Sequence, residues 1–342
     1  MNVFKSYLEI TSMAKTVDDA TDDNATEEQI ETIAVVSDIH VGQYKGRERF
    51  DPGLWETTVE RVNRLEPDLI VFPGDLTASG RREEFERVVG LLQELECQRR
   101  VYTRGQKDWD EECPECFAEF FVQLPVYKGF GGLGVFSIDS TDPQRSKMRG
   151  EVDETLQMMD CIKPSSPEEY DEHRAYYDSK MNIYLRKMER LRDRLDSDLD
   201  FGLVGRLQRK WLTEELKKRW SRLKLKVVMT HYSPVGTSHM DNELVDAYDI
   251  KRACVEEGVH LLVAGDRHVS HFEEFSYGGE HNVAVFQAGS VSNIQDDPNQ
   301  YGVIKIDWGQ REVTLCSYYV ETGEPATNRF HGNVNYPITF SF

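Results

Sequence analysis

Six residues that can bind a metal ion through oxygen or nitrogen each follow a short apolar segment of the sequence. They are Asp38, His40, Asp75, His231, Asp266 and His268. Because the loops at the carboxyl ends of parallel strands meet at one edge of a sheet, we expect these side chains to lie together. Mixed carboxylate and imidazole ligands suit manganese, iron or zinc. Two such ions, about 3.5–4 Å apart, can clamp a phosphoryl group, lower the pKa of a shared water and stabilise developing charge.

The elements expected to position these residues alternate between strands and helices. Short continuous apolar runs predict strands buried on both faces at 33–36, 69–72, 225–229 and 261–263. Helical spacing of apolar residues predicts helices at 52–65, 81–95, 207–220 and 250–257. This alternation is typical of an α/β sheet with its functional loops at the carboxyl ends of the strands. Further short strands at 271–277, 283–287, 303–307 and 313–319 suggest the antiparallel edge of a second sheet.

A charged insertion interrupts this alternation at about residues 141–203. Apolar residues recur in it at steps of three and four, at Met181, Tyr184, Met188, Leu191 and Leu195. This spacing predicts an amphipathic helix. We favour a helix packed on the body of the domain; a dimerisation arm or a substrate lid is the alternative. Residues 1–31 are expected to form a polar leader, and residues 32–342 a single domain.

Composition limits the classes of function. The 342 residues include 41 Lys and Arg against 61 Asp and Glu, a net charge of −20, which repels phosphate backbones and disfavours broad nucleic-acid binding. No apolar run has the roughly 18 residues that a membrane span needs, so no membrane partner is expected. Six cysteines are too few for a disulfide scaffold. We therefore expect a cytoplasmic protein with reduced thiols, in which Cys113 and Cys116 are unrelated to each other despite their zinc or redox spacing.

The order and spacing of several motifs resemble the calcineurin-like metallophosphoesterases, and more closely the branch similar to class III cyclic-nucleotide phosphodiesterases. The resemblance runs from about residue 33 to residue 290, interrupted by the insertion. The motifs that carry it are Ser37-Asp38-Ile39-His40, Gly74-Asp75-Leu76-Thr77-Ala78-Ser79-Gly80 and Thr230-His231-Tyr232-Ser233-Pro234. Two further segments, 136–142 and 208–216, look like regions common in that branch.

The resemblance implies a four-layer αββα sandwich of two mixed sheets with a helical insertion. It also implies hydrolysis of a phosphomonoester or phosphodiester by metal-activated water, with one or two divalent ions per chain. Manganese is the first expectation, and iron or zinc are the alternatives. By position in the motifs, the first metal would be held by Asp38, His40 and His268. Asp75 would bridge the two ions, and His231 would belong to the second.

Two motifs depart from the family pattern. Where the family has Gly-Asn-His-Asp, this chain has Gly105-Gln106-Lys107-Asp108, and where it has Gly-His-X-His, this chain has Gly265-Asp266-Arg267-His268. One interpretation keeps Gln106 and Asp266 as ligands of the second ion. The extra anionic ligand then lowers the Lewis acidity of that ion and favours hard metals such as manganese or magnesium.

A second interpretation places the Lys107 ammonium at the second metal position, paired with Asp266, so that one ion suffices. In either case Lys107, Arg104 and Arg267 are expected to bind the phosphate, and Asp75, Lys107 and Asp108 to serve catalysis. A lysine with a pKa near 10 is a poor proton donor at neutral pH, so Lys107 is expected to bind phosphate rather than protonate a leaving group.

Two alternatives to this enzyme remain open. One is a metal-binding pseudoenzyme or scaffold whose second site has degenerated. The other is a nuclease of the same family, whose basic groove the acidic total would hide. The sequence does not indicate the substrate or the oligomeric state.

Overall fold

The computed structural model describes residues 29–44, 46–110, 112–141, 145–196, 202–235, 244–276, 281–292, 298–326 and 337–342. Most of the leader predicted at 1–31 therefore lies outside the described residues. No described helix combines the length and the apolar character needed to cross a bilayer.

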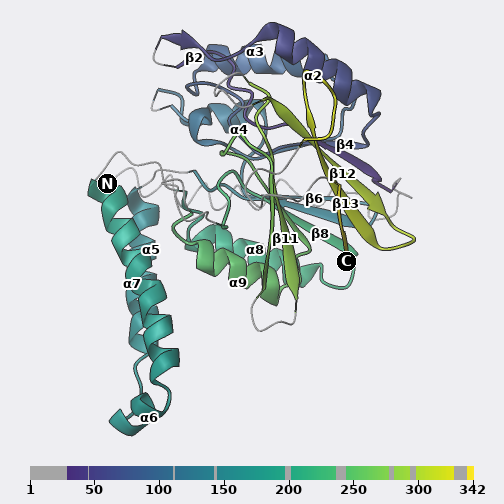
Figure 1. The fold of residues 1–342 in the computed structure, drawn as a ribbon. Coiled ribbons are helices and arrows are strands. Elements are labelled where there is room, and N and C mark those ends of the chain that lie inside the picture. Colours follow the sequence, from purple (N-terminus) through teal and green to yellow (C-terminus); the bar gives the residue numbers. More distant parts are fainter. Residues whose placement is uncertain are drawn as a thin grey trace.

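Two six-stranded mixed sheets form the centre of the molecule (Figure 1). The first sheet has the order β14 (Ile338–Ser341), β13 (Glu312–Tyr319), β12 (Gln300–Asp307), β1 (Thr32–Val35), β4 (Leu69–Phe72) and β5 (Arg100–Tyr102). The second has the order β10 (His271–Ser276), β11 (Asn282–Gln287), β9 (Leu261–Ala264), β8 (Leu225–Met229), β7 (Leu133–Ser137) and β6 (Val126–Phe130). A small hairpin joins β2 (Gln43–Tyr44) to β3 (Arg47–Glu48).

Strands β1, β4 and β5 are parallel, as are β7, β8, β9 and β11, so the candidate ligands follow the carboxyl ends of parallel strands. One expectation was wrong. The strands predicted at 303–307 and 313–319 are β12 and β13, and they extend the first sheet rather than the second. Periodicity identifies a strand but carries no information about which sheet it joins.

Helices cover the outer face of each sheet. On the first sheet lie α2 (Pro52–Arg64), α3 (Arg82–Leu92) and α4 (Cys116–Phe120), and on the second lie α8 (Arg206–Lys218) and α9 (Ala247–Glu256) (Figure 1). Helix α2 begins where the Asp51 carboxylate accepts hydrogen bonds from the main-chain N–H groups of Gly53 and Leu54, with Pro52 in its first turn. The layers are helix, sheet, sheet and helix.

Three apolar clusters fill the three interfaces between these layers. In β1, Ile33 and Val35 point toward the second sheet, whereas Ala34 contacts the cluster beneath α2 and α3. In β9, Leu261 points between the sheets and Leu262 toward α8 and α9. Burial on both faces explains why these strands are continuous apolar runs. The fold is the predicted four-layer α/β sandwich of two mixed sheets.

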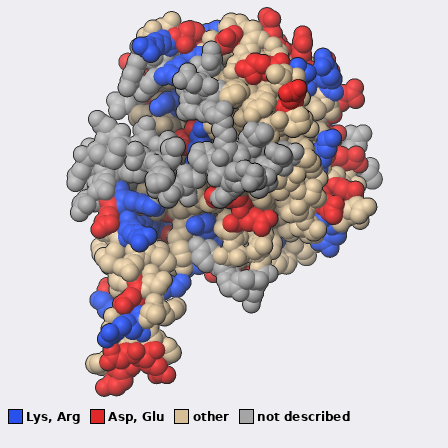
Figure 2. Space-filling model, viewed as in Figure 1, with Lys and Arg blue, Asp and Glu red and all other residues tan. Residues whose placement is uncertain are grey.

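The insertion forms a helical hairpin that projects from the body of the molecule (Figure 1). It consists of α5 (Arg145–Cys161), the short α6 (Pro167–Glu172) at its tip and α7 (Arg174–Asp196). Leu191, Leu203 and Val245 form a small cluster that packs its root onto the body. The amphipathic helix expected in this region is α7, which pairs with α5 and also contacts α9 of the body through Lys180, Tyr184 and Lys187. Figure 2 shows acidic side chains gathered at the tip.

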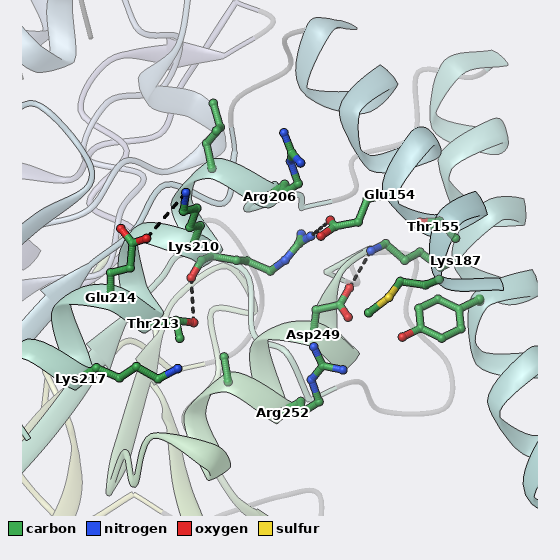
Figure 3. Close-up of a pocket in the computed structure, with 15 residues that line it drawn as sticks. Glu154, Thr155, Lys187, Arg206, Lys210, Thr213, Glu214, Lys217, Asp249 and Arg252 are labelled. Atoms are coloured by element: carbon green, nitrogen blue, oxygen red, sulfur yellow. Dashed lines mark hydrogen bonds and ion pairs between the residues drawn. The ribbon is translucent and has the colours of Figure 1, made fainter. Parts of the chain in front are cut away.

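Charged side chains also fix the root of the hairpin. Arg209 of α8 lies 2.9 Å from Glu151 of α5, and Lys187 of α7 lies 3.0 Å from the same carboxylate. Lys187 also pairs with Asp249 at 2.6 Å, and Arg209 pairs with Glu154 and Asp246. Figure 3 shows part of this network in the groove between the hairpin, α8 and α9. All of these cations are matched by carboxylates.

Candidate metal centre

Main-chain hydrogen bonds join the first two ligand loops before any side chain is considered. The N–H of Asp38 donates to the carbonyl of Gly74, and the N–H of His40 donates to the carbonyl of Asp75, both at 3.0 Å. These bonds continue the parallel pairing of β1 with β4 beyond the ends of the strands. The loops that carry Asp38, His40 and Asp75 are therefore held in one fixed register.

One group of candidate ligands consists of Asp38, His40 and His268. His268 Nε2 lies 3.4 Å from Asp38 Oδ1 and 3.3 Å from His40 Nε2. His40 Nε2 lies 3.8 Å from the same Asp38 oxygen. One carboxylate oxygen and two ring nitrogens thus converge from β1 and β9, whose loops lie more than two hundred residues apart in sequence.

The second group consists of Asp38, Asp75 and His231. His231 Nε2 lies 3.4 Å from Asp75 Oδ1, while the other oxygen of Asp75 lies 3.6 Å from His40 Nε2. The two oxygens of Asp75 therefore face histidines of different groups. Asp266 lies at the margin of this group, with Oδ1 3.9 Å from His231 Nε2.

Two buried atoms at the centre of these groups test whether a cation fits. Asp38 Oδ1 and His231 Nε2 are fully buried, and neither has a hydrogen-bond partner of acceptable geometry. Buried polar atoms without partners are costly and rare, and a metal ion is one of the few groups that satisfies both a carboxylate oxygen and an imidazole nitrogen. The donor set and its orphaned atoms fit divalent cations.

The backbone at the candidate ligands has an unusual conformation. Asp38, His40, Asp75, Asp266 and His268 have φ values of 56°, 50°, 52°, 75° and 61°, all in the left-handed region. Only two other non-glycine residues with described positions, Glu66 and Arg311, share this conformation. Left-handed backbone costs energy for residues with a Cβ and is concentrated at functional sites. Here it turns each ligand inward directly after its strand.

The acidic groups of the centre show how strongly burial acts on them. Burial and the nearby charge of Asp38 raise the pKa of Asp75 to about 7, although His231 opposes the shift. Burial likewise raises the pKa of Asp266 to about 6. Burial also favours protonation of Asp38, but the close contact and charge of His268, together with the charges of His231 and His40, outweigh this and lower its pKa to about 2. Crowded carboxylates of this kind are stabilised by a bound cation.

The histidines differ from one another in charge. Burial lowers the pKa of His40 well below its usual range, and the charge of His268 adds to this effect. Burial acts in the same direction on His231, but the carboxylates of Asp75, Asp38 and Asp266 outweigh it and raise its pKa to about 9. Its other nitrogen, Nδ1, lies 2.9 Å from the carbonyl oxygen of Pro73, a contact that leaves Nε2 directed at Asp75.

The loop after β5 carries the first departure from the family pattern. It forms the short helix η1 (Gln106–Asp108), and the Lys107 N–H donates to Asp75 Oδ1 at 2.8 Å. The half-buried Gln106 side chain makes no hydrogen bond with any described residue. The Asp108 carboxylate accepts from the N–H groups of Thr77 and Gly105 and from the Thr77 hydroxyl. Asp108 therefore joins two ligand loops, which is a positioning task.

The pairing of Lys107 with Asp266 that one interpretation required is not formed. No ion pair within 4.0 Å links the two side chains. The Asp266 carboxylate lies instead beside His231, with its Oδ1 3.9 Å from His231 Nε2. The charge of Lys107 acts instead on His40, whose pKa it helps to lower. The reason is that η1 is bound through its main chain to Asp75, between the two groups of ligands.

Arg104 and Arg267 are placed differently. Arg104 Nη2 lies 2.5 Å from Asp139 Oδ2, and its buried Nε has no hydrogen-bond partner. Asp139 is held in turn by Gln208 of α8: the main-chain N–H of Asp139 donates to the side-chain amide oxygen of Gln208 at 2.8 Å. Arg267 Nη2 donates to the carbonyl of Val235 at 3.1 Å. Arg104 is thus fixed by a carboxylate next to the centre, whereas Arg267 is directed toward the loop after β8.

Three groups that support the ligands were not found from the sequence. The Ser37 hydroxyl donates to Asp38 Oδ2, the Pro73 carbonyl contacts His231, and the Ser290 hydroxyl donates to the main-chain oxygen of Asp38 at 2.9 Å. Ser37 belongs to a recognised motif and Pro73 adjoins one, but neither position indicated a supporting role. Ser290 lies 252 positions from Asp38 and carries no local signal.

The expectation about the paired cysteines was wrong. Cys113 and Cys116 are joined by a disulfide, with their Cα atoms 5.3 Å apart. The spacing of two intervening residues permits this bridge where the chain turns into α4. Cys97, Cys161, Cys254 and Cys316 are free thiols.

Comparisons with known proteins agree with this fold. The model of the calcineurin-like phosphoesterase family matches residues 31–270. A dimetal phosphatase from Danio rerio has a similar structure, with a TM-score of 0.59 and 12% identity, over 92% of this chain and 100% of that one. Purple acid phosphatase PPD1 from yellow lupin (Lupinus luteus) seeds gives a TM-score of 0.52 and 10% identity, over 88% of this chain and 53% of that one. No curated protein matches the chain in sequence.

Proposed function

Because the chain belongs to the calcineurin-like phosphoesterase family, we propose that it is a metal-dependent hydrolase of phosphomonoesters or phosphodiesters. One observation carries the proposal: the two oxygens of the buried Asp75 face His40 on one side and His231 on the other. A carboxylate in this position is suited to bridge two cations.

The two groups of side chains assign the ligands. Asp38, His40 and His268 would hold one cation, and His231 with Asp266 would hold the other, with Asp75 between them. Divalent cations at such a site polarise phosphoryl oxygens and increase the acidity of water. We propose manganese, because the set contains three carboxylates as well as histidines, and Asp266 stands where the family has a histidine. Iron and zinc are the alternatives.

The cationic side chains near the centre would bind the phosphate. Arg104 is held in place by Asp139, so its guanidinium is oriented before a substrate arrives. Lys107 is only half-buried, and its backbone is bound to Asp75, so its charge lies beside the ligands. Asp108 keeps the loops of Thr77 and Gly105 together. In this proposal Lys107 and Arg104 balance the charge of the phosphoryl group and Asp108 positions them.

Metal analysis and enzyme assays together test the proposal. Elemental analysis of the purified chain after equilibration with Mn²⁺ should give two ions per chain, and p-nitrophenyl phosphate or bis(p-nitrophenyl) phosphate should be hydrolysed. Asp75→Asn should lower both the metal content and kcat, the latter by about a hundredfold or more, because the shared ligand is lost. Asp153→Asn, at an exposed position of α5, is the matched control and should change neither.

Different outcomes separate the alternatives. Equal hydrolysis by Asp75→Asn and the parent would reject the proposal. Metal binding without hydrolysis would indicate a metal-binding scaffold, which the substitutions at Gln106, Lys107 and Asp266 would then explain. One ion per chain would favour a single-metal centre. Salt-dependent binding to DNA would indicate a nuclease.

The leaving group provides a separate test of the role of Lys107. If Lys107 binds phosphate and donates no proton, esters with good leaving groups should be hydrolysed much faster than alkyl esters. A series of aryl and alkyl phosphates of increasing leaving-group pKa measures this dependence. A rate that stays constant across the series would mean that a protonated side chain assists departure.

A further inference from the structure

A second pocket lies at the edge of the sandwich opposite the metal centre. Its volume is about 680 Å³, within the usual range for small-molecule sites. Lys224 and His260, which line it, precede β8 and β9, whereas the ligands follow the far ends of these strands. The five residues of β8 place the two sites about 16 Å apart or more. Trp308 and Arg311, from the turn between β12 and β13, close it from the first sheet.

The charge of this pocket is opposite to that of the chain. Lys224, Lys226 and Arg311 line it, and none of its described lining residues is Asp or Glu, although acidic residues outnumber basic ones by 61 to 41. No carboxylate of a described residue lies within 4.0 Å of these three cations. The groove at the hairpin root differs, because Lys187 and Arg209 there are paired with carboxylates (Figure 3). Lys224, Lys226 and Arg311 therefore have no acidic partner among the described residues.

Aromatic rings line the same pocket. The Trp220 side chain is 52% exposed, and the Lys226 Nζ lies 3.6 Å from the centroid of its ring. The same ammonium donates to the carbonyl of Glu257 at 2.8 Å, which fixes its position. Trp308 packs edge to face against Phe342 with centroids 5.7 Å apart. The pocket therefore combines large apolar surfaces with cations, and the part of the Trp220 ring that Lys226 does not cover is exposed for stacking.

His260 reports the electrostatic environment of the pocket. Burial lowers its pKa to about 4, and the charges of Lys226, His281 and Arg311 act in the same direction. Its Nδ1 accepts a hydrogen bond from the Lys226 N–H at 3.0 Å. Burial alone does not reveal the sign of the potential, but the added effect of Lys226, His281 and Arg311 matches a positive potential, which attracts anions.

We propose that this pocket binds a small planar aromatic anion of the nucleotide class, with its ring on Trp220 and its phosphates between Lys224 and Arg311. Each half of such a ligand matches one half of the site. Stacking uses the exposed indole, and the cations that no described carboxylate pairs with balance the phosphate charge. The proposal concerns a site apart from the metal centre and does not depend on the phosphoesterase activity.

Binding of ADP to the full-length chain tests the proposal, with adenosine and pyrophosphate as its two halves. Calorimetry gives the dissociation constants, and quenching of tryptophan fluorescence reports the ring near Trp220 and Trp308. ADP should bind at least tenfold more tightly than either half. Trp220→Ala and the pair Lys224→Glu with Arg311→Glu should each weaken ADP binding by at least tenfold. Lys218→Glu, an exposed residue of α8 outside the pocket, should change it by less than twofold.

The metal centre provides the second control, since it too could bind phosphates. In Asp75→Asn, ADP binding at the second pocket should be unchanged, whereas metal-dependent hydrolysis should be lost if the proposed function is right. ADP binding that Asp75→Asn abolishes and Trp220→Ala leaves intact would overturn the proposal. Pyrophosphate that binds as tightly as ADP would overturn the nucleotide assignment, and the absence of saturable binding at millimolar ADP would overturn the site itself.

Discussion

The hydroxyl of Ser290 donates a hydrogen bond to the main-chain oxygen of Asp38, at 2.9 Å. The neighbouring N–H of Val291 donates to the carbonyl of Ser37, at 3.2 Å. The loop after β11, which contributes no candidate ligand among its described residues, thereby fixes the loop after β1, which contributes two. The position of Asp38 is thus fixed from the second sheet as well as by its own hydrogen bond to the Gly74 carbonyl in the first.

Removing this hydrogen bond should loosen the metal centre. Ser290→Ala leaves the buried Asp38 carbonyl without its side-chain partner and releases a left-handed segment of backbone. We expect Mn²⁺ to bind about 10-fold more weakly, as measured by competition with a metallochromic chelator. Ser179→Ala, at an exposed position of α7, should leave the affinity unchanged. An unchanged affinity in Ser290→Ala would show that the loop holds its shape without this contact.

The same substitution at two glycines should have opposite effects. A Cβ at Gly105 would overlap the main-chain nitrogen and the carboxylate of Asp75. Gly105→Ala should therefore displace Asp75 and abolish metal binding, with a loss of about 2 kcal/mol or more in the free energy of unfolding. At Gly90, in helix α3, an added Cβ meets no atom within 4 Å. Gly90→Ala should raise that free energy by about 0.5–1 kcal/mol.

Urea denaturation and metal titration distinguish the two variants. Metal binding should persist in Gly90→Ala, since α3 contributes no ligand. If Gly105→Ala binds metal as the parent does, the close approach of these two loops is not required for the centre.

Arg209 should be essential for the attachment of the hairpin. It is buried, and it pairs with Glu151, Glu154 and Asp246. Arg209→Met leaves buried carboxylates without a partner, which typically costs about 3–5 kcal/mol of stability. Chemical denaturation measures this loss, and limited proteolysis should show faster cleavage between α5 and α7.

The exposed neighbour Lys210 supplies the control. Lys210→Met removes a charge from the same helix but should change stability by only about 0.5 kcal/mol or less. Adding Glu151→Gln to Arg209→Met should recover part of the loss, because one uncompensated charge is removed. A loss below about 1 kcal/mol for Arg209→Met would mean that water or the remaining cation Lys187 compensates.

His260 should make stability depend on pH. Burial and its basic neighbours hold its pKa at about 4 in the folded chain, against about 6.5 in an unfolded one. Between these values the unfolded state binds more protons, so stability should fall as the pH drops from about 6.5 to 4. The effect should be on the order of 2 kcal/mol, since the ring is only partly shielded from solvent.

Denaturation at pH 7 and pH 4.5 measures this contribution. His260→Asn keeps a hydrogen-bond acceptor for the Lys226 N–H but cannot titrate, so its stability should differ less between the two pH values. His173→Asn, exposed at the tip of the hairpin, should keep the dependence of the parent. A parent and a His260→Asn variant with equal pH dependence would contradict the prediction.

The sequence predicts what is local in this protein. The apolar runs before Asp38, Asp75, His231 and Asp266 identify the buried strands, because burial on both faces leaves no polar alternation. Their carboxyl ends then place the ligand candidates at one edge. The spacing from Met181 to Leu195 likewise identifies α7 as amphipathic.

What the sequence does not predict depends on long-range contacts. The pairing of α7 with α5 rests on buried charges such as Glu151, which in sequence resembles any solvated glutamate. Two further contacts arise only once both sheets have packed. One is the contact of Ser290 with Asp38, and the other is the interface between the sheets that brings Trp308 toward Lys224. The disulfide of Cys113 and Cys116 depends on the local turn into α4, which spacing alone does not establish.

The left-handed conformation of the five candidate ligand residues has a consequence for how an ion would enter. The main chain at these residues is held by hydrogen bonds and close packing within the sandwich. The geometry of the metal site is therefore set by folding rather than by the bound ion. An arriving ion then organises little of the chain, and the entropy of ordering the loops is already accounted for in the stability of the domain. A preformed site of this kind should select ions by size, and it should exchange them without unfolding of the chain.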